Sequence, residues 1–407
     1  MTNGHGTVYD DIWLVDGVRT GFADFTSVLA DISPTDLGIK VAREALAKST
    51  IAAEDIDMVV AGNMAQSSFD AYFLPRHIGL YAGVPIPVPA LLVHRLCGTG
   101  FETIIQAADS ITLGKASKVL CVGTESMSRN PVASYTTRNG FKMGQVEFKD
   151  FLWEATKDTA SSTSMGDTAE NLAKKYAISR EEVDEFAAQS FARAIDSADF
   201  RSGEIVPVIS ETFTREGYND RGIRLPRGVA SFAVDEHVRP TPMEVLSKLK
   251  PAFKGVQTGG NSSAVVDGAA AAIVVGGKTV KERGLKPLAR IVAADVVGVP
   301  PEIMGIGPAP AIAAVVKRAG LTLADIDRFE INEAFGAQYL AVEKELGLDR
   351  AKANVNGGAI ALGHPLGVTG VRLCITVARE LHRRGLKHGI ASACIGGGQG
   401  VAILIEV

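Results

Sequence analysis

The sequence predicts an α/β protein made of two similar halves, each with a mixed or parallel sheet that is covered by helices. The first observation is a repeat: Asp55-Ile56-Asp57 recurs as Asp325-Ile326-Asp327, 270 residues later. The same offset relates three pairs of single residues, which are His94 and His364, Gly100 and Gly370, and Ala108 and Ala378. One shared offset over separate segments indicates an internal duplication. The two copies are therefore expected to pack as halves related by pseudo-twofold symmetry.

Strands and helices alternate in each copy, which is the second observation. Both copies begin with an apolar strand, at 12–15 and at 288–292, followed by a helix with apolar residues at helical spacing, at 40–48 and at 311–316. A short strand (57–61 and 327–331), a glycine-rich turn, a second helix and a closing strand (118–122 and 389–393) come next. Such alternation is typical of a sheet with helices on both faces.

The third observation is an insert of different character between the copies. Residues 123–260 are rich in Ser, Thr, Arg and Lys, with amphipathic helices expected at 168–176 and 180–196. Asp167 and Ser179 are expected to cap these helices. The sequence thus predicts an N-terminal half at 1–122, an inserted loop domain at 123–260 that lies over the two sheets, and a C-terminal half at 261–407.

Composition excludes several classes of protein. A hydrophobic fraction of 46% and a charged fraction of 22% are ordinary for a folded domain, and a net charge of −4 gives no sign of a nucleic-acid partner. The chain has no apolar run long enough for a membrane span, and its first 11 residues lack the pattern of a signal peptide. Because four cysteines in 407 residues are too few for a disulfide framework, reduced thiols and a cytoplasmic location are expected.

Cys97 is the predicted nucleophile. It follows the apolar stretch 90–93 and precedes Gly98-Thr99-Gly100 and a helix. A thiol at the start of a helix meets unpaired N–H groups and the positive end of the dipole, which favour the thiolate. Most free cysteines are buried structural residues, but a strand-to-helix turn between glycines favours a catalytic role.

Cys394 is the second candidate thiol. It ends an apolar strand and enters Ile395-Gly396-Gly397-Gly398, where successive glycines indicate close approach of a ligand or of another segment. Their N–H groups can form an anion nest beside the thiol, while the alternative is a crossing of small residues between two sheets. Cys121 and Cys374 have no glycine neighbours and are expected to fill the core.

His364 and Asn332 complete the candidate site. His364 lies between Gly363 and Pro365 on a helix-entry loop, where an imidazole can act as a base or donate to an oxyanion. Asn332 follows the strand 329–331 at a carboxyl edge, and its amide can hold a water in an oxyanion site. Glu333 is expected to bond the imidazole or to be a buried support, and His94 to be a packed or hydrogen-bonded support. The histidines lack the spacing of metal ligands, so no metal site is predicted.

These signatures, in this order, resemble the thiolase family of acetyl-CoA acyltransferases over residues 15–407. The segments Met165-Gly166-Asp167-Thr168-Ala169-Glu170-Asn171 and Met304-Gly305-Ile306-Gly307-Pro308 belong to the same pattern. The resemblance implies a duplicated αβαβα layered fold with two mixed sheets and a loop domain.

The resemblance also implies a ping-pong reaction. Cys97 takes the acyl group as a thioester and His364 accepts its proton, while Cys394 moves the proton of acetyl-CoA. The oxygen of acetyl-CoA would face His364 and a water on Asn332, and the acyl-enzyme oxygen would face the N–H groups of Cys97 and Gly396.

By the same resemblance, coenzyme A is a substrate and no cofactor is bound permanently. The residues expected to contact CoA or substrate are Arg239, Ser263, Met165 and Met304. A basic stretch is a further candidate for its phosphates, comprising Arg221, Arg224, Arg227, Arg239, Lys248, Lys250 and Lys254. A segment at 127–143 resembles the tetramer loop of the family, so a homodimer or homotetramer is expected.

Departures from the family pattern concern the substrate. His94 stands where the family usually has asparagine, Ser164 where short-chain members often have histidine, and 264–267 replaces a usual Gly-x-Asn-Asp. Together with Phe151 and Trp153 they suggest an acyl group other than acetoacetyl. A decarboxylating ketosynthase of the same fold normally lacks the second cysteine, and a non-catalytic acyl-CoA-binding subunit would have lost a catalytic side chain, so both alternatives are disfavoured.

Overall fold

A single ten-stranded sheet runs through the computed structural model, which describes residues 4–407; residues 1–3 of the predicted N-terminal half lie outside the described residues. The strand order is β16-β17-β18-β15-β1-β14-β5-β3-β4, with β2 paired to β14. The strands are β1 (His5–Arg19), β2 (Ala23–Asp24), β3 (Met58–Gly62), β4 (Ala90–Val93), β5 (Lys118–Glu125), β14 (Val266–Gly276), β15 (Ala289–Gly298), β16 (Arg328–Ile331), β17 (His388–Ile395) and β18 (Gln399–Glu406).

The strand pairings confirm the internal duplication. In the N-terminal half β1, β14 and β5 pair antiparallel and β5 pairs parallel with β3; in the C-terminal half β15, β18, β17 and β16 repeat this pattern. β4 has its counterpart in a single bridge between Phe329 and Ala353. The two predicted mixed sheets are continuous because β1 pairs with β15 through its first residues and with β14 through its last.

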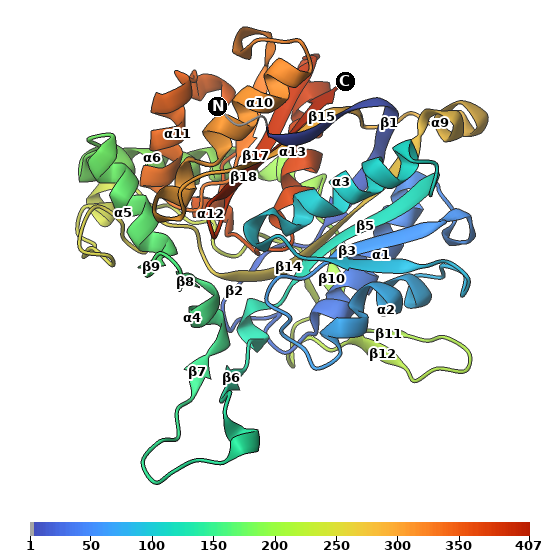
Figure 1. Ribbon diagram of the computed structural model, residues 1–407. Helices are drawn as coiled ribbons and strands as arrows, with labels where there is room; N and C mark the ends of the chain where they lie inside the picture. Colours follow the sequence, from blue (N-terminus) through green and yellow to red (C-terminus); the bar gives the residue numbers. More distant parts are fainter. Residues whose placement is uncertain (1–3) are drawn as a thin grey trace.

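Helices form the other layers. They are α1 (Pro34–Ser49), α2 (Leu74–Tyr81), α3 (Thr99–Thr112), α4 (Phe151–Ala155), α5 (Met165–Lys175), α6 (Arg180–Asp196), α7 (Ala198–Ser202), α8 (Met243–Leu246), α9 (Gly277–Arg283), α10 (Pro308–Arg318), α11 (Gly336–Leu346), α12 (Ala359–Leu362) and α13 (Thr369–Arg384). α1 packs on the N-terminal sheet and α10 on the C-terminal sheet, while α3 and α13 pack on each other between the two (Figure 1). The predicted αβαβα layering is therefore present.

The repeat glycines lie where α3 and α13 cross. A Cβ added to Gly100 would lie 2.7 Å from the backbone nitrogen of Gly370, and one added to Gly370 would collide with the backbone nitrogen of Phe101. Only glycine allows two backbones to approach this closely. The crossing brings together the two helix-entry turns, one after Cys97 and one after His364.

The predicted boundary at 260/261 needs correction. β14 follows that boundary, but it pairs with β1 and β5 and therefore belongs to the N-terminal half. The insert is consequently a connection between β5 and β14, two neighbouring strands of one half. Local patterning could not reveal this, because both pairings of β14 join residues far apart in the chain. Part of the insert projects as an arm that carries β6 (Val132–Ala133) and β7 (Lys149–Asp150) (Figure 1).

Two helices of the insert begin at capping boxes. Ser179 caps α6 together with Glu182, as expected, and the bounds of α6 agree with the prediction. α5 begins three residues earlier than predicted, because Ser164 is its N-cap. Asp167 is therefore the third helical residue, which completes the capping box, rather than the cap.

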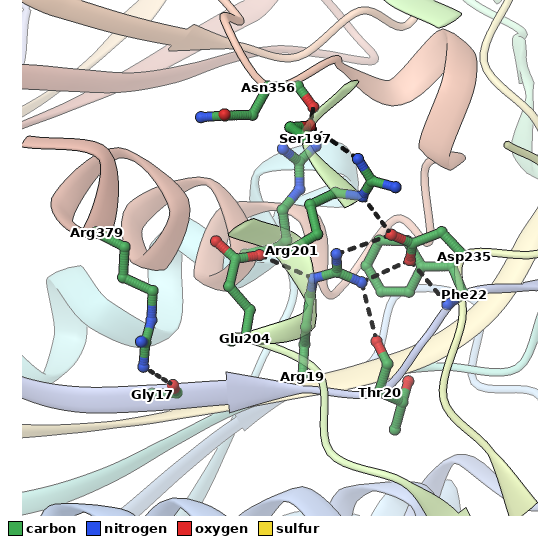
Figure 2. Close-up of polar contacts among 12 residues, drawn as sticks. Gly17, Arg19, Thr20, Phe22, Ser197, Arg201, Glu204, Asp235, Asn356 and Arg379 are labelled. Carbon is green, nitrogen blue, oxygen red and sulfur yellow. Dashed lines mark hydrogen bonds and ion pairs between the residues drawn. The ribbon is translucent and has the colours of Figure 1, made fainter. Parts of the chain in front are cut away.

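A buried ion network fixes the insert to the sheet. Arg19 of β1 makes two bonds to Asp235, of 2.6 and 2.9 Å, and one of 3.1 Å to Glu204, while Arg201 bonds Asp235 at 3.0 Å (Figure 2). Burial alone raises the pKa of Asp235, but the guanidinium groups of Arg19 and Arg201 hold it below its usual value. Breaking one partner of such a buried pair typically costs about 3–5 kcal/mol. The network therefore holds the segment that leads to Arg239.

Candidate active site

Cys97 lies in a strained turn between β4 and α3. It is half-buried within a short 3-10 helix, Leu96–Gly98. Leu96 has a φ of 46°, a left-handed conformation that costs a non-glycine residue roughly 1–3 kcal/mol. Thr99 holds the turn, since its Oγ accepts from the backbone N–H of Arg95 (2.9 Å) and donates to the carbonyl of Leu96 (2.7 Å). The strained backbone is thus stabilised at the residue next to the thiol.

Cys394 is fully buried near the end of β17. It packs in a small apolar cluster with Met304 and Ala334, against which Met165 and Phe335 also lie. The chain then turns through Gly397 and Gly398, both at positive φ (78° and 86°), into β18. Met165 and Met304, predicted as substrate contacts, therefore form an apolar wall beside this thiol.

The structure brings the two cysteine loops together although 297 residues separate them in the chain. The backbone N–H of Gly396 donates to the sulfur of Cys97. A Cβ added to Gly98 would lie 2.6 Å from Ile395 Cδ1, and one added to Gly396 would lie 3.3 Å from Leu96 Cδ1. The N–H groups of Cys97 and Gly396 consequently both act on the sulfur of Cys97.

Both thiols are protonated at neutral pH. Burial raises the pKa of Cys97 to about 11, although the N–H groups of Gly396 and of Cys97 itself act in the opposite direction; the charge of Glu125 adds to the rise. Burial raises the pKa of Cys394 further, and the charge of Cys97 adds to it. The sequence analysis expected the helix terminus to favour a thiolate at Cys97. Desolvation of the charged form outweighs that effect.

His364 is buried and neutral. Burial, with the positive charge of Arg372 as a second cause, lowers the pKa of His364 to about 3. Its Nδ1 lies 2.6 Å from Thr369 Oγ1, which itself donates to the carbonyl of Pro365 at 3.3 Å. Nδ1 is therefore the protonated nitrogen of the ring. The lone pair is left on Nε2, which lies 3.3 Å from the side-chain amide nitrogen of Asn332.

Asn332 is fully buried beside the imidazole. Its backbone N–H bonds the carbonyl of Ser392 on β17, which fixes the residue at the carboxyl end of β16. Its Oδ1 is buried and has no hydrogen-bond partner among residues 4–407. The amide thus presents one nitrogen to His364 and one oxygen that can accept a further hydrogen bond.

Glu125 links the loop after β3 to the loop after His364, and it was not found from the sequence. Its buried carboxylate accepts the N–H groups of Met64 and Ala65, both at 3.0 Å, and of Gly367 at 2.9 Å. Burial raises the pKa of Glu125 to about 7. The available signal was a carboxylate three residues beyond the predicted closing strand 118–122, since open sheets place ligand sites at that edge.

An apolar wall lines the side of Cys97. It is formed by Met64, Ala65, Met127, Leu152 and Leu366, with Leu96 packed against it. Leu152 comes from the insert, Met127 follows β5, and Leu366 follows His364, so all three parts of the chain contribute. Sequence reasoning missed these residues because their contacts are not local.

The supporting residues are partly as predicted. Glu333 does not bond the imidazole; it is a buried support that accepts from Ser190 (2.7 Å), Asn354 (2.8 Å) and the N–H of Ile360 (3.2 Å), and it thereby holds the loop that precedes His364. Of the two alternatives for His94, the hydrogen-bonded one is observed: the residue is exposed rather than packed, and its Nε2 lies 3.1 Å from the carbonyl of Met64.

The remaining cysteines behave as core residues. Cys121 and Cys374 are buried in the main apolar cluster, as predicted. Within residues 4–407, no cluster of His, Cys, Asp and Glu side chains is arranged to hold a metal ion, and no helix of this part of the chain has the length and apolarity needed to cross a membrane.

The candidate CoA contacts divide into free and engaged residues. Arg239 has 58% of its side chain exposed and lies 3.9 Å from Asp24. Ser263 donates its N–H to the carbonyl of Ala334 at 3.0 Å, close to Asn332 in the chain. Two members of the basic stretch are not free for phosphates: Arg221 pairs with Asp36 (2.8 Å) and Asp70 (2.6 Å), and Arg224 bonds two backbone carbonyls, those of Glu211 and Ile223.

Comparison with known proteins identifies the family. The family model "Thiolase, N-terminal domain" matches residues 12–278, and "Thiolase, C-terminal domain" matches residues 285–407. The chain belongs to the thiolase family, and it is an acyltransferase. The division between the two matches falls after β14, in agreement with the pairing of that strand.

Individual relatives match over nearly the whole length. The chain is 45% identical to human mitochondrial 3-ketoacyl-CoA thiolase, covering 97% of this chain and 98% of the relative, and 41% identical to beta-ketothiolase BktB of Cupriavidus necator, covering 97% and 99%. Human mitochondrial 3-ketoacyl-CoA thiolase in complex with CoA superposes with a TM-score of 0.92 at 44% identity, covering 100% of both chains. The acetyl-CoA acetyltransferase of Bacillus anthracis gives 0.89 at 40% identity, again over 100% of both chains.

The relatives contradict the predicted cytoplasmic location. The 3-ketoacyl-CoA thiolases of human, cattle and mouse, at 45%, 46% and 45% identity, are named as mitochondrial proteins. The prediction rested on the lack of a recognised targeting pattern and on unpaired cysteines, and these cysteines do not distinguish one reducing compartment from another.

Proposed function

We propose that the chain is a CoA-dependent thiolase that cleaves a 3-ketoacyl-CoA to acetyl-CoA and a shortened acyl-CoA, or runs the reverse Claisen condensation, through an acyl group on Cys97. One observation carries the proposal: thiols from the two halves lie close enough for the charge of Cys97 to raise the pKa of Cys394, beside the N–H of Gly396 that donates to Cys97. The named activities of the relatives support it, as does the neighbouring structure that holds CoA.

The first half-reaction transfers the acyl group to Cys97. Its sulfur attacks the 3-keto carbon, and the thiol proton passes to Nε2 of His364. Because the pKa of Cys97 is raised and that of His364 is lowered, the proton moves as the bond forms rather than before it. The carbonyl oxygen takes up negative charge and is stabilised by the N–H groups of Cys97 and Gly396. Losing one such donor typically costs about 2.7–4 kcal/mol of transition-state stabilisation.

The carbon–carbon bond breaks as the tetrahedral centre collapses. The electron pair of that bond passes to the α-carbon of the departing acetyl-CoA, which leaves as an enolate. The enolate oxygen faces His364 and a water held by Asn332. Cys394 donates its proton to that carbon. The thiol of a second CoA then gives its proton to the Cys394 thiolate and attacks the acyl group, which forms the shortened acyl-CoA. The released sulfur of Cys97 takes back the proton held by His364, so that all three side chains return to their starting state. Condensation follows the same steps in reverse.

Substrate binding is proposed for four residues outside the reacting centre. The exposed guanidinium of Arg239 suits a phosphate of CoA, and Ser263 suits the pantetheine arm that leads toward Asn332. Met165 and Met304 would pack against the acetyl end beside Cys394. The apolar wall beside Cys97 suits an aliphatic acyl chain.

A homodimer or homotetramer is part of the proposal. β4 is the edge of the sheet, and Leu91 on it is exposed. Several large apolar side chains near it in sequence are also exposed, namely Phe69, Tyr72, Phe73 and Ile86. The arm exposes a second set, with Val132, Tyr135, Met143 and Phe148. Apolar surface at a sheet edge is what a second copy of the chain would cover.

Kinetics with substituted Cys97 test the proposed function. With a panel of 3-ketoacyl-CoA substrates, the wild-type chain should give the parallel double-reciprocal lines of a ping-pong reaction. Cys97→Ala should reduce kcat by at least about 1,000-fold, since it removes the nucleophile. Cys121→Ala, which removes a core thiol, serves as the control. Intersecting lines, or a Cys97→Ala variant with normal turnover, would contradict the proposal.

A further inference from the structure

Arg95 occupies a place between the two cysteine loops that the reaction scheme leaves unexplained. It lies two residues before Cys97, and its side chain forks. Nε bonds Glu102 of α3 at 2.6 Å, and Nη1 bonds the side-chain oxygen of Gln399 at 3.1 Å. The second carboxylate oxygen of Glu102 accepts from Gln106 at 2.7 Å, so the acidic partner is itself oriented.

Gln399 is held through its backbone by strand pairing on both sides. It is the first residue of β18 and pairs with Ile395 of β17 and Gly298 of β15, so its backbone closes the glycine turn that contains Gly396. A Cβ added to Gly307 would collide with the carbonyl of Gln399, which shows how closely that backbone is packed. The side chain of Gln399 therefore reaches Arg95 from a rigid base.

The turn that contains Arg95 has a strained backbone at Leu96. The left-handed backbone of Leu96 separates Arg95 from Cys97, and a strained conformation persists only where its surroundings hold it. The bond between Arg95 and Gln399 ties this turn to the turn of Gly396. These are the two segments whose N–H groups face the same acyl oxygen in the proposed reaction.

We propose that Arg95 is a positioning residue that sets the spacing between the N–H groups of Cys97 and Gly396, by joining Glu102 in the N-terminal half to Gln399 in the C-terminal half. The proposal rests on the proposed thiolase function. Arg95 acts through the two turns and touches no reacting atom. The proposed donors to the enolate oxygen of acetyl-CoA are His364 and a water on Asn332. Both residues follow elements of the C-terminal half and do not depend on the link through Arg95.

The chemistry of the fork makes Arg the required residue. A planar guanidinium can bond two acceptors in fixed directions, whereas a lysine ammonium is a single point charge on a flexible chain. Arg95 and Gln399 line a cavity of about 760 Å³, together with Glu102 and Gln106. With 30% of its side chain exposed, Arg95 can be replaced without opening a hole in the core.

The experiment compares the two chemical steps. Single-turnover acylation of Cys97 by an acyl-CoA depends on the spacing of the two N–H groups. Exchange of the α-protons of acetyl-CoA in deuterium oxide, measured in the Cys97→Ala background, depends on Cys394, His364 and Asn332. Arg95→Met and Gln399→Leu should each slow acylation by about 10-fold, while exchange stays within about 2-fold, because each removes one hydrogen bond between the turns.

Controls separate positioning from general damage. The double variant should be no slower than either single variant, since both break one link. Gln399→Glu, which keeps an acceptor for Arg95, should retain acylation. Arg290→Met removes an arginine with the same 30% side-chain exposure from an ion pair with Glu406, away from the site, and should change neither rate.

The outcomes are distinct. Unchanged acylation in Gln399→Leu would overturn the proposal, whether or not Arg95→Met folds. Equal slowing of acylation and exchange in these variants would also overturn it, because loss of the link would then have acted on the whole site. Absence of acylation at Cys97 in the wild-type chain would instead refute the proposed function.

Discussion

The acid–base properties of the site depend on a few residues whose environments oppose one another. Burial keeps Cys97 protonated and His364 unprotonated, so the two side chains do not form a thiolate–imidazolium ion pair before substrate binds. A protonated thiol is a weak nucleophile, which protects the empty site from side reactions. In the proposed reaction, transfer of the proton to Nε2 of His364 couples activation of the sulfur to bond formation.

The rate of alkylation of Cys97 should therefore keep rising with pH into the alkaline range. A pKa raised to about 11 leaves little thiolate at pH 7, and its fraction should rise about tenfold per pH unit up to that value. Initial rates of modification by iodoacetamide in the absence of substrate, followed by peptide mass spectrometry, measure this. A plateau near pH 7 would show a stored thiolate and contradict the account.

Sequence alone predicted the residues that lie in distinctive turns. Cys97 and His364 have a glycine neighbour, Cys394 lies two residues before a glycine run, and Asn332 lies at a strand end, so local pattern was sufficient to propose them. Glu125, Thr369 and Arg95 were missed because their importance lies in bonds to segments up to 304 residues away or in ring orientation. The pKa of Cys97 was also beyond prediction, since burial is a property of the whole fold.

Elements position the site through the crossing of α3 and α13. The same repeat that relates Gly100 to Gly370 places the catalytic turns of both halves side by side. The repeat was visible in the sequence, and its physical reason is the close contact of two backbones. The placement of β14 was not, because strand partners in a duplicated fold cannot be told from pattern alone.

Gly370→Ala should destabilise the protein at this crossing. The added methyl would collide with the backbone nitrogen of Phe101, and such overpacking typically costs about 1–3 kcal/mol, or more when backbone has to move. Chemical denaturation followed by circular dichroism measures the loss. Gly298→Ala is the control, because a Cβ there has open space. Equal denaturation midpoints for the two variants would show that α3 and α13 pack less closely than described.

At the scale of the whole molecule, the proposed reaction needs both copies of the repeat. The N-terminal half supplies Cys97 and Glu125, the C-terminal half supplies Asn332, His364 and Cys394, and the insert adds Leu152 to the wall. Neither half alone holds both Cys97 and Cys394, or the complete set of proposed oxyanion donors. The ion network of Arg19 and Asp235 keeps the insert in place over them.

Light scattering should give the mass of a dimer or a tetramer of the 42.8 kDa chain. The exposed apolar side chains at β4 and on the arm are the physical reason, because water would otherwise contact them. Replacing Leu91 and Ile86 by Lys should weaken assembly through the edge strand. A monomer mass for the unmodified chain would contradict the proposed assembly.

The most direct test of the account separates the work of the two sulfurs. Cys394→Ala is incubated with an acyl-CoA, and its peptides are analysed by mass spectrometry while carbon–carbon bond formation is assayed in parallel. The account predicts a stable acyl group on the peptide that contains Cys97, together with loss of condensation and cleavage. An acyl group on another residue, or normal turnover without Cys394, would contradict it.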